Sequence, residues 1–497
     1  MDSKNFSDES RGLMCSSSGL VGNVHQVKKP PKKAPLKCNN LLKNPSFEAG
    51  LTGWETDNVI SSGTNTFEGT QLAQMRTGAA SMSQDISLAG LKQSPLFLSF
   101  NVYAGNNDEN SNGDLVVTIL WLDYELHNIG AGLEFFIPTG RINSRARLTY
   151  FDVTERPPAE AAWARLLFSK GTVSNNTILV DQVILAPVGT TNLVENSSFE
   201  AGLTGWTSTT FVPNFQLSFD GAATAALPTT AQLSTLFQDV PIKHLPAQSS
   251  FLFSFAGLTS GFAILDVQVL WLDKNDSIIG TPGLALRLPN AVLLSQSNYL
   301  TYLDLTNPAP YGAVKARIMF STNFVEINSV LRLDKIILAE AASPNLVQNP
   351  SFDANLSSWT AVNATALADN DNYEGVFVAN VDDGGGLIFQ DIPLPCGAGH
   401  CFLLNFALGY EAGVTPPFYG NMLVKVLWLD ARGQQIGLGL SLVIPGNREN
   451  KRQWLVYADI TGPAPSNAVM ARIQFTKSAG DPNFSIQIDK VLFGRLI

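Results

Sequence analysis

The 497-residue sequence predicts an all-β fold, with three tandem antiparallel β-sandwich domains behind a flexible N-terminal arm. One observation is a motif written three times, as NPSFEAGLTGW from Asn44, NSSFEAGLTGW from Asn196 and NPSFDANLSSW from Asn349. A second is an apolar segment ending in Trp-Leu-Asp in every copy. A third is the number of short apolar segments between turn residues, without a helical period. Many short strands in each copy indicate a two-sheet sandwich.

The arm is predicted for residues 1–39. Its segment 28–37, KKPPKKAPLK, combines proline with five lysines, which favours an extended, solvated chain. The copies begin at Asn40, Asn192 and Asn345, so the period is 152 and then 153 residues. A period this long corresponds to a whole domain rather than a solenoid repeat. The predicted domains are 40–188, 189–341 and 342–497.

Within each copy the strand signals follow one order. An apolar strand begins near Leu96, Phe251 or Phe402, and the Trp-Leu-Asp strand comes next. Later segments read ARLLF, ARIMF and ARIQF, and the copies close with LVDQVIL, RLDKIIL and QIDKVLF.

Alternation in the Trp-Leu-Asp strand predicts which side chains are buried. Val117, Ile119 and Trp121 fall on one face, and the opposite face is mixed. We expect Trp121, Trp271 and Trp428 in the core, and also the motif tryptophans Trp54, Trp206 and Trp359. The arginines of the later strand fall out of phase with its apolar residues, so we expect surface ion pairs at Arg165, Arg317 and Arg472.

Composition and charge exclude several function classes. With 45% hydrophobic and 15% charged residues, the chain is typical of a folded protein. The net charge is −10, and residues 1–39 hold seven of the basic and three of the acidic residues, so the remainder is more acidic still. Such a surface repels phosphate backbones, and we expect no nucleic-acid partner. The longest uninterrupted apolar runs are short, such as Ile119–Leu122, and therefore predict no membrane span.

The opening pattern also resembles a known family. The pattern Asn-Leu-(Leu/Val)-x-Asn-(Pro/Ser)-Ser-Phe-(Glu/Asp), the Trp that follows and the closing Asp-x-(Val/Ile)-x-(Leu/Phe) strand resemble carbohydrate-binding modules of the family 4 and 9 type. Those are jelly-roll sandwiches of the galactose-binding-like superfold. Similar domains occur on surface proteins of spore-forming bacteria. The resemblance covers residues 40–497 and implies fold more than function.

The resemblance implies a structural calcium ion that bridges the first and last strands of each domain. The carboxylates at the matching positions are Glu48 with Asp181, Glu200 with Asp334, and Asp353 with Asp489. Calcium takes six to eight oxygen ligands, so a bridging role suits carboxylates. The alternative is that these side chains cap turns or accept bonds from backbone amides.

The four cysteines allow two interpretations. Cys396 and Cys401, in CGAGHC, are close enough in sequence for a local disulfide, and Cys15 and Cys38 in the arm are candidates for an inter-chain crosslink. The alternative is four free thiols in a reducing compartment.

Candidate ligand contacts lie in the loops before the Trp-Leu-Asp strand. The loop of the first copy carries Tyr103, and that of the third carries Tyr410, Phe418 and Tyr419. The second copy has only GLTSGFA there and is the poorest candidate. For any single residue, an ordinary variable loop is the alternative.

These observations favour two functions. The first is a noncatalytic surface protein that binds polysaccharide or a surface glycan, since the four histidines occupy no matching positions and no carboxylate pair has glycosidase spacing. The alternative is a structural subunit of a spore or cell-surface layer or appendage that self-associates through the arm. The N-terminus lacks the apolar core of a secretion signal, so cytoplasmic synthesis with another route to the surface is expected.

Overall fold

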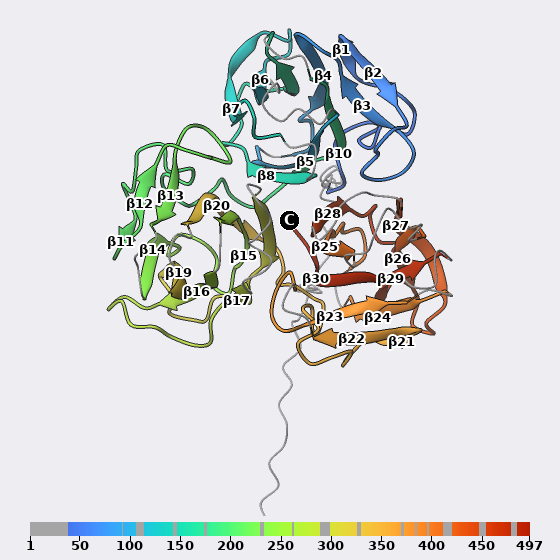
Figure 1. The fold of residues 1–497 in the computed structure, drawn as a ribbon. Coiled ribbons are helices and arrows are strands. Elements are labelled where there is room, and N and C mark those ends of the chain that lie inside the picture. The colour runs from blue at the N-terminus through green and yellow to red at the C-terminus, as the bar shows by residue number, and fades with distance from the viewer. Residues whose placement is uncertain are drawn as a thin grey trace, which may run out of the picture.

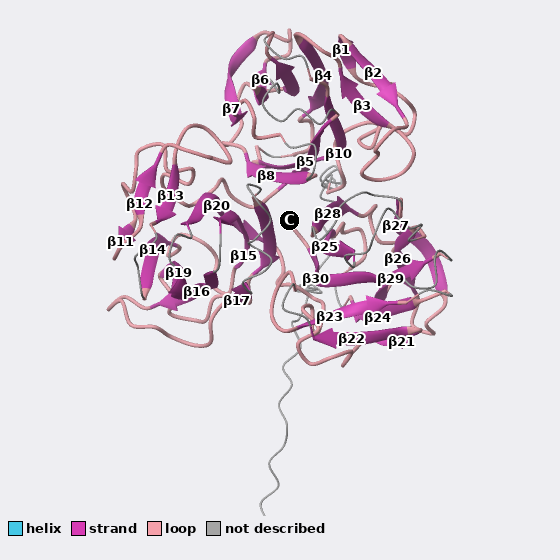
Figure 2. Cartoon of the chain, in the orientation of Figure 1, coloured by secondary structure: helices cyan, strands magenta, loops and turns pink. Residues whose placement is uncertain are grey.

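The protein is all-β in the computed structural model (Figures 1 and 2). The described residues form thirty strands and no helix, arranged in six five-stranded antiparallel sheets. No helix in this part of the chain is therefore able to cross a membrane. The described residues are 38–91, 93–105, 114–142, 147–172, 176–228, 233–260, 263–288, 299–325, 330–368, 372–382, 385–394, 397–410, 420–446, 454–478 and 485–497.

Each copy of the motif contributes two sheets, and we call residues 40–188, 189–341 and 342–497 repeats 1, 2 and 3. The outer sheet of repeat 1 has the order β1 (Glu55–Asp57), β4 (Ala80–Ser87), β9 (Trp163–Lys170), β6 (Leu115–Leu122) and β7 (Asn128–Ile137). Its inner sheet has the order β2 (Val59–Ser62), β3 (Leu72–Met75), β10 (Ile178–Pro187), β5 (Leu96–Ala104) and β8 (Leu148–Val153).

Repeats 2 and 3 have the same topology. The outer sheet of repeat 2 is β11 (Thr207–Ser208), β14 (Ser234–Pro241), β19 (Lys315–Val325), β16 (Ala263–Leu272) and β17 (Leu284–Leu288). Its inner sheet is β12 (Val212–Asn214), β13 (Thr224–Leu227), β20 (Val330–Ala341), β15 (Ser250–Ser260) and β18 (Leu300–Leu305). The outer sheet of repeat 3 is β21 (Thr360–Val362), β24 (Leu387–Pro393), β29 (Met470–Lys477), β26 (Met422–Leu429) and β27 (Gln435–Ile444). Its inner sheet is β22 (Ala364–Ala368), β23 (Phe377–Val381), β30 (Ile486–Gly494), β25 (Leu403–Tyr410) and β28 (Leu455–Ile460).

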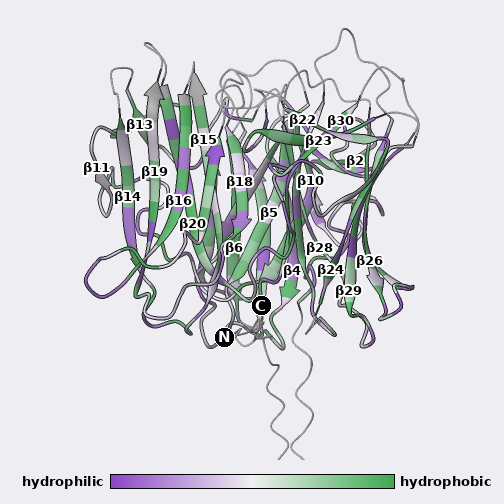
Figure 3. Cartoon of the chain, turned by 90° about the horizontal axis from the view of Figure 1, so that it is seen from below, coloured by the Kyte–Doolittle hydropathy of each residue, from purple (hydrophilic) through white to green (hydrophobic). Residues whose placement is uncertain are grey.

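The two sheets of a repeat differ in how they are buried. Residues of β4, β6 and β9 alternate between buried and half-buried, so the outer sheet has one face in the core and one toward solvent. Every residue of β8 and β10 is buried. Figure 3 shows the corresponding concentration of hydrophobic strands in the interior. This part of the inner sheet is therefore covered on both faces, by its own outer sheet and by neighbouring repeats, whereas the edge strand β2 is partly exposed.

The three inner sheets meet around a common centre through their edge strands β8, β18 and β28 (Figure 1). Thr149 Oγ1 donates to the carbonyl of Val456 at 2.5 Å, and Thr301 Oγ1 donates to the carbonyl of Thr149 at 2.9 Å. The hydroxyl of Tyr373 donates to the carbonyl of Thr301. Hydrogen bonds thus run from each repeat to another, which closes the three repeats into a ring.

The opening motif is a bonded turn, as its threefold recurrence suggests. Asn44 adopts φ +49°, and its side chain donates to the carbonyls of Gly50 and Thr52 and accepts from the amide of Ala49. Trp54 Nε1 donates to the carbonyl of Asn44, which holds the indole against the core. Asn196 and Asn349 repeat these contacts. The expected core positions of the six repeated tryptophans are confirmed by their burial.

Candidate functional site

The sites that recur with the repeats are the contacts between them, which we call junctions 1–2, 2–3 and 3–1. Each junction combines an aromatic stack, a hydrogen bond from a glycine amide and a cluster of polar side chains. All three features come from a Phe/Tyr-acid-Gly segment and from the β8 and β10 strands or their equivalents. The segments are Phe67–Gly69, Phe219–Gly221 and Tyr373–Gly375.

At every junction an aromatic ring of one repeat stacks on a tyrosine of another. Ring centroids are 4.5 Å apart for Tyr150 and Phe219, 4.6 Å for Tyr302 and Tyr373, and 4.1 Å for Tyr457 and Phe67. These rings are buried, so each repeat completes the hydrophobic core of a neighbour. Offset aromatic pairs add about 0.5–1.5 kcal/mol to the burial itself.

The glycine of each segment ties the junction to an outer-sheet edge strand. Gly221 donates its amide to the carbonyl of Phe136 at 2.9 Å, and Asp220 Oδ1 accepts from the amide of Phe136 at 2.9 Å. Gly375 and Gly69 donate in the same way to Arg287 and Val443. These glycines have positive φ, and an added Cβ at Gly221 would lie 2.5 Å from Glu200 Oε1. Glycine is therefore required where the segment contacts the next repeat.

Junctions 1–2 and 2–3 each bury a lysine between two carboxylates. Lys335 Nζ lies 2.6 Å from Asp152 of repeat 1 and 2.7 Å from Asp220 of repeat 2. Burial opposes the charged form of Lys335, but the two carboxylates outweigh it and raise its pKa above the ordinary value. At junction 2–3, Lys490 Nζ lies 2.8 Å from Asp304 and 3.6 Å from Glu374. Both ammonium groups therefore remain charged across the neutral range.

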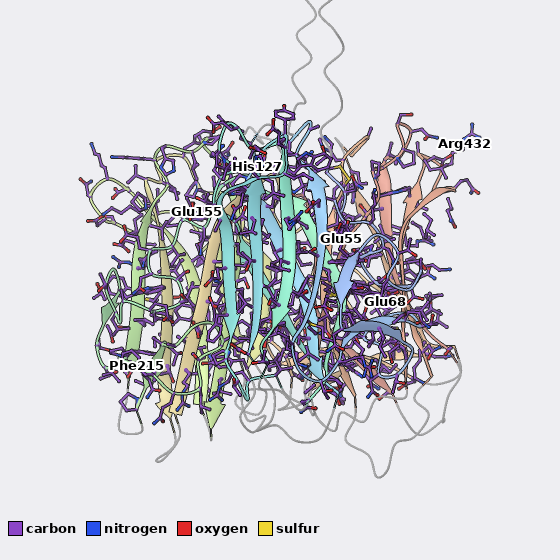
Figure 4. All side chains as sticks on the ribbon, turned by 90° about the horizontal axis from the view of Figure 1, so that it is seen from above. Glu55, Glu68, His127, Glu155, Phe215 and Arg432 are labelled. Carbon is purple, nitrogen blue, oxygen red and sulfur yellow. A yellow bond between two sulfur atoms is a disulfide. The ribbon has the colours of Figure 1, made fainter. Side chains whose placement is uncertain are left out.

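Junction 3–1 has the carboxylates but not the lysine. Gln182 occupies the position of Lys335 and Lys490, with the same left-handed backbone, and its Nε2 is buried without a hydrogen-bond partner in the described structure. Glu68 and Asp459 occupy the acid positions. Burial, followed by repulsion from Asp181, raises the pKa of Glu68 to about 8. Desolvation likewise raises the pKa of Asp459 to about 7. Figure 4 shows Glu68 on the side of repeat 1 that faces repeat 3.

The carboxylates predicted to bind calcium accept hydrogen bonds from backbone amides. Glu48 Oε1 accepts from the amides of Thr70 and Gln71, at 2.8 and 2.9 Å. Asp181 Oδ2 accepts from the amides of Phe67 and Glu68, at 2.8 and 3.2 Å. The same pattern surrounds Glu200 with Asp334 and Asp353 with Asp489.

These bonds hold the Phe/Tyr-acid-Gly segment in place, which is the alternative role considered from the sequence. Each carboxylate faces N–H donors, whereas a calcium cage needs further oxygen ligands. Among the described residues, no group of three or more His, Cys, Asp or Glu side chains is placed to hold a metal. The carboxylates therefore act as acceptors for backbone amides in this structure, and calcium binding stays a prediction.

The predicted disulfide is wrong in its pairing. Cys401 is bonded to Cys38, 363 residues away, and not to Cys396. The local spacing of CGAGHC suggested Cys396 because a sequence does not reveal that repeats 3 and 1 are adjacent. Cys38 is consequently not a free thiol for an inter-chain crosslink. Cys15 and Cys396, like most of the predicted arm, lie outside the described residues.

Of the four predicted ligand residues, the structure describes the side chain of one. Tyr103 lies in β5 and is half-buried, and the guanidinium of Arg147 sits 4.7 Å from its ring centroid. Tyr410 ends β25. Phe418 and Tyr419 lie outside the described residues.

The expected surface arginines form a second recurring arrangement, on the solvent face of the outer sheets. Arg317 Nε and Nη2 bind the two oxygens of Asp239 at 2.6 and 2.8 Å, and its guanidinium lies 4.4 Å from the ring centroid of Phe237. Repeat 3 has the same three groups at Arg472, Asp391 and Phe389. Repeat 1 keeps the ion pair of Arg165 and Asp85 but has Ser83 at the aromatic position.

The junction residues were not predicted as a site. A signal existed in the closing strands, where the shared Asp is followed by Gln182 in the first copy and by Lys335 and Lys490 in the others. A lysine inside an apolar strand indicates a buried partner. Its partners Asp152 and Asp304 are in a different repeat, and alignment of the copies cannot show that.

Comparison with known proteins finds similarity only among solved structures. No family model and no curated protein matches the chain. Carbohydrate-binding modules of families 22, 16, 61 and 4 are among the similar structures.

Three of these structures illustrate the similarity. The N-terminal CBM22-1-CBM22-2 tandem domain of Paenibacillus barcinonensis Xyn10C is 14% identical, with a TM-score of 0.26, covering 62% of this chain and 99% of that one. Family 16 Carbohydrate Binding Module-2 is 18% identical, with a TM-score of 0.24, covering 30% and 99%. The enzymatically active domain of bacteriophage CBA120 tailspike protein 4 is 16% identical, with a TM-score of 0.25, covering 30% and 21%. Similarity of this degree carries no argument about what the chain binds.

Proposed function

We propose that this chain is a noncatalytic surface protein that binds polysaccharide or a surface glycan through its repeats. The observation that carries the proposal is the half-buried cluster of Phe237, Arg317 and Asp239 on the solvent face of the outer sheet of repeat 2, with its copy in repeat 3. In each cluster a planar guanidinium lies over an aromatic ring, and its fork uses two of its five N–H donors. Apolar surface with a few fixed polar groups is the general composition of a small-molecule or sugar subsite.

The ring arrangement supports binding to a repetitive polymer. The inner sheets are buried at the centre, so the outer sheets of all three repeats face solvent at fixed relative positions (Figure 1). Linked sites on one polymer raise the effective concentration of the second contact, and overall affinity rises without new interactions.

The disulfide between Cys38 and Cys401 supports location at a surface. Disulfides persist in oxidising environments and are rare in the cytosol. The alternative role as a structural subunit loses one of its two proposed crosslinking thiols to this bond.

Pull-down on a panel of insoluble and soluble glycans tests the proposal. We expect retention on at least one glycan, and about tenfold weaker binding, or about 1.4 kcal/mol, for Phe237→Ala with Phe389→Ala. Phe215→Ala is the matched control, because Phe215 (labelled in Figure 4) is an exposed phenylalanine of repeat 2 that follows the inner-sheet strand β12 and is not part of the cluster. Tyr103→Ala tests the binding residue predicted from the sequence, so comparing it with the phenylalanine variants shows whether glycan binds at Tyr103 or on the outer sheets. Absence of retention on every glycan would refute the proposal.

A further inference from the structure

We propose that junction 3–1 is a clasp: the ring opens there, and not at junctions 1–2 or 2–3, when the Cys38–Cys401 disulfide is reduced and Glu68 and Asp459 are ionised. This proposal is independent of glycan binding. It rests on three differences between junction 3–1 and the other two, in covalent connection, in the buried cation and in the charge on the carboxyl groups.

The first difference is the covalent connection. Repeats 1 and 2, and repeats 2 and 3, follow each other in the chain, so a peptide links each pair. The linker backbone is bonded to the next repeat, with Gly189 donating to Glu340 at 3.1 Å and Ala342 donating to Arg495 at 3.0 Å. Repeats 3 and 1 are not consecutive. The disulfide between Cys38, beside the start of repeat 1, and Cys401 of repeat 3 makes the link.

This link can be broken without cutting the chain. Two molecules of a low-molecular-weight thiol supply two electrons and two protons. The S–S bond breaks, Cys38 and Cys401 become thiols, and the two reductant sulfurs join in a new disulfide. Cys38 is half-buried and Cys401 is buried, so the sulfur of Cys38 is the more accessible to the attacking thiolate.

The second difference is that, among the described residues, no lysine lies between the carboxyl groups of junction 3–1. The ammonium groups of Lys335 and Lys490 each offset one negative charge of the carboxylate pairs of the other junctions, and both are held at 2.6 to 2.8 Å from a carboxylate of the preceding repeat. Gln182 brings no charge to the same place, and its Nε2 has no partner in the described structure. The other features of the junction are retained, including the stack of Tyr457 on Phe67 and the bond from Gly69 to Val443.

The third difference follows from the second. Burial is the main cause that opposes ionisation of Glu68. The carboxylates Asp181, Asp459 and Glu48 oppose it further by repulsion. The amide of Val443 favours the ionised form of Glu68, and the amide of Ile460 favours that of Asp459, but neither outweighs desolvation. The closed junction therefore holds protons that the separated groups would release.

The direction of the pH effect is set by these raised pKa values. The closed form binds protons more tightly than the open form, so its stability is complete below the ordinary carboxyl range. It is lost as the pH rises through about 7 for Asp459 and about 8 for Glu68. At junctions 1–2 and 2–3 burial also raises the pKa of Asp152 and Glu374, but the nearby Lys335 and Lys490 counteract it in part, and we expect these junctions to weaken less.

The test measures the radius of gyration by small-angle scattering at pH 5.5 and pH 9.0. The proteins are the wild type, Cys38→Ser with Cys401→Ser, and the same double variant with Gln182→Lys. We expect the wild type to be compact at both pH values and the double variant to expand at pH 9.0 only. Gln182→Lys supplies the missing cation. The backbone conformation at position 182 matches that of Lys335 and Lys490, so we expect this substitution to keep the double variant compact at pH 9.0.

Three results would overturn the clasp. If the double variant stays compact at both pH values, neither the disulfide nor the protonation of Glu68 and Asp459 keeps junction 3–1 closed. If it is already expanded at pH 5.5, protonation does not keep the junction closed. Failure of Gln182→Lys to restore compactness would exclude the charge explanation. Folded wild type treated with a water-soluble phosphine at each pH repeats the comparison without any cysteine substitution, so the result does not depend on refolding of the variant.

Discussion

Tyr457 of repeat 3 stacks on Phe67 of repeat 1, with the ring centroids 4.1 Å apart and the planes inclined by 15°. Phe67 thereby belongs to the hydrophobic core of repeat 3, although the chain places it in repeat 1. Equivalent rings from repeats 2 and 3 enter the cores of repeats 1 and 2. The stability of each repeat is consequently coupled to a neighbour.

Removing the ring of Phe67 tests this coupling. Phe67→Ala deletes a side chain that is 1% exposed, and such substitutions cost about 3–5 kcal/mol. We expect a lower unfolding midpoint by calorimetry, with repeats 1 and 3 both affected in hydrogen exchange. Phe215→Ala is the comparison, since Phe215 is 72% exposed and its loss should change stability by no more than about 0.5 kcal/mol. Equal effects of the two variants would contradict the coupling.

The buried lysine of junction 1–2 should matter far more than a surface one. Lys335→Met leaves Asp152 and Asp220 without their cation, and breaking a buried pair in this way costs about 3–5 kcal/mol. Lys315→Met removes an exposed pair with Asp276, worth about 0–1 kcal/mol. Denaturant unfolding at pH 7 measures both. The loss at Lys335 should shrink in acid, where the carboxylates are protonated, and a constant loss would argue against charge as its cause.

The glycine of the junction segment should not tolerate a side chain. Gly69 has φ +61°, and an added Cβ would lie 2.3 Å from Glu48 Oε1. Gly69→Ala should cost about 1–3 kcal/mol from backbone strain, with displacement of the Glu48 carboxylate in addition. Gly78→Ala is matched in φ, at +79°, but its Cβ meets nothing within 4 Å. Thermal unfolding of the pair isolates the contact, and identical midpoints would show that the contact costs nothing.

Calcium binding at Glu48 and Asp181 can be tested by thermal unfolding after chelator treatment. A ligand present at one hundred times its dissociation constant stabilises by about 2.7 kcal/mol. Because backbone amides already bond both carboxylates, we expect no change in midpoint when calcium is returned. A calcium-dependent rise that Glu48→Gln abolishes would instead establish the cation site that the family resemblance implies.

The all-β class, the alternating Trp-Leu-Asp strand and the surface arginines were predicted from the sequence because they depend on contacts within one repeat. Val117, Ile119 and Trp121 are buried because a strand alternates its faces, whatever lies beyond the sheet. The motif glutamate was assigned two roles, and the sequence could not choose between them because both place Glu48 near the last strand.

What only the tertiary structure decided is how the repeats meet. The partner of Cys401 is 363 residues away, and the partners of Lys335 and Lys490 include a carboxylate from a different repeat. Periodicity reports which face of a strand is apolar, but it does not report which surface covers that face. The repeated sequence therefore determined three similar β units, whereas the packing of their inner sheets determined the ring, its two lysine junctions and the one junction where Gln182 stands instead.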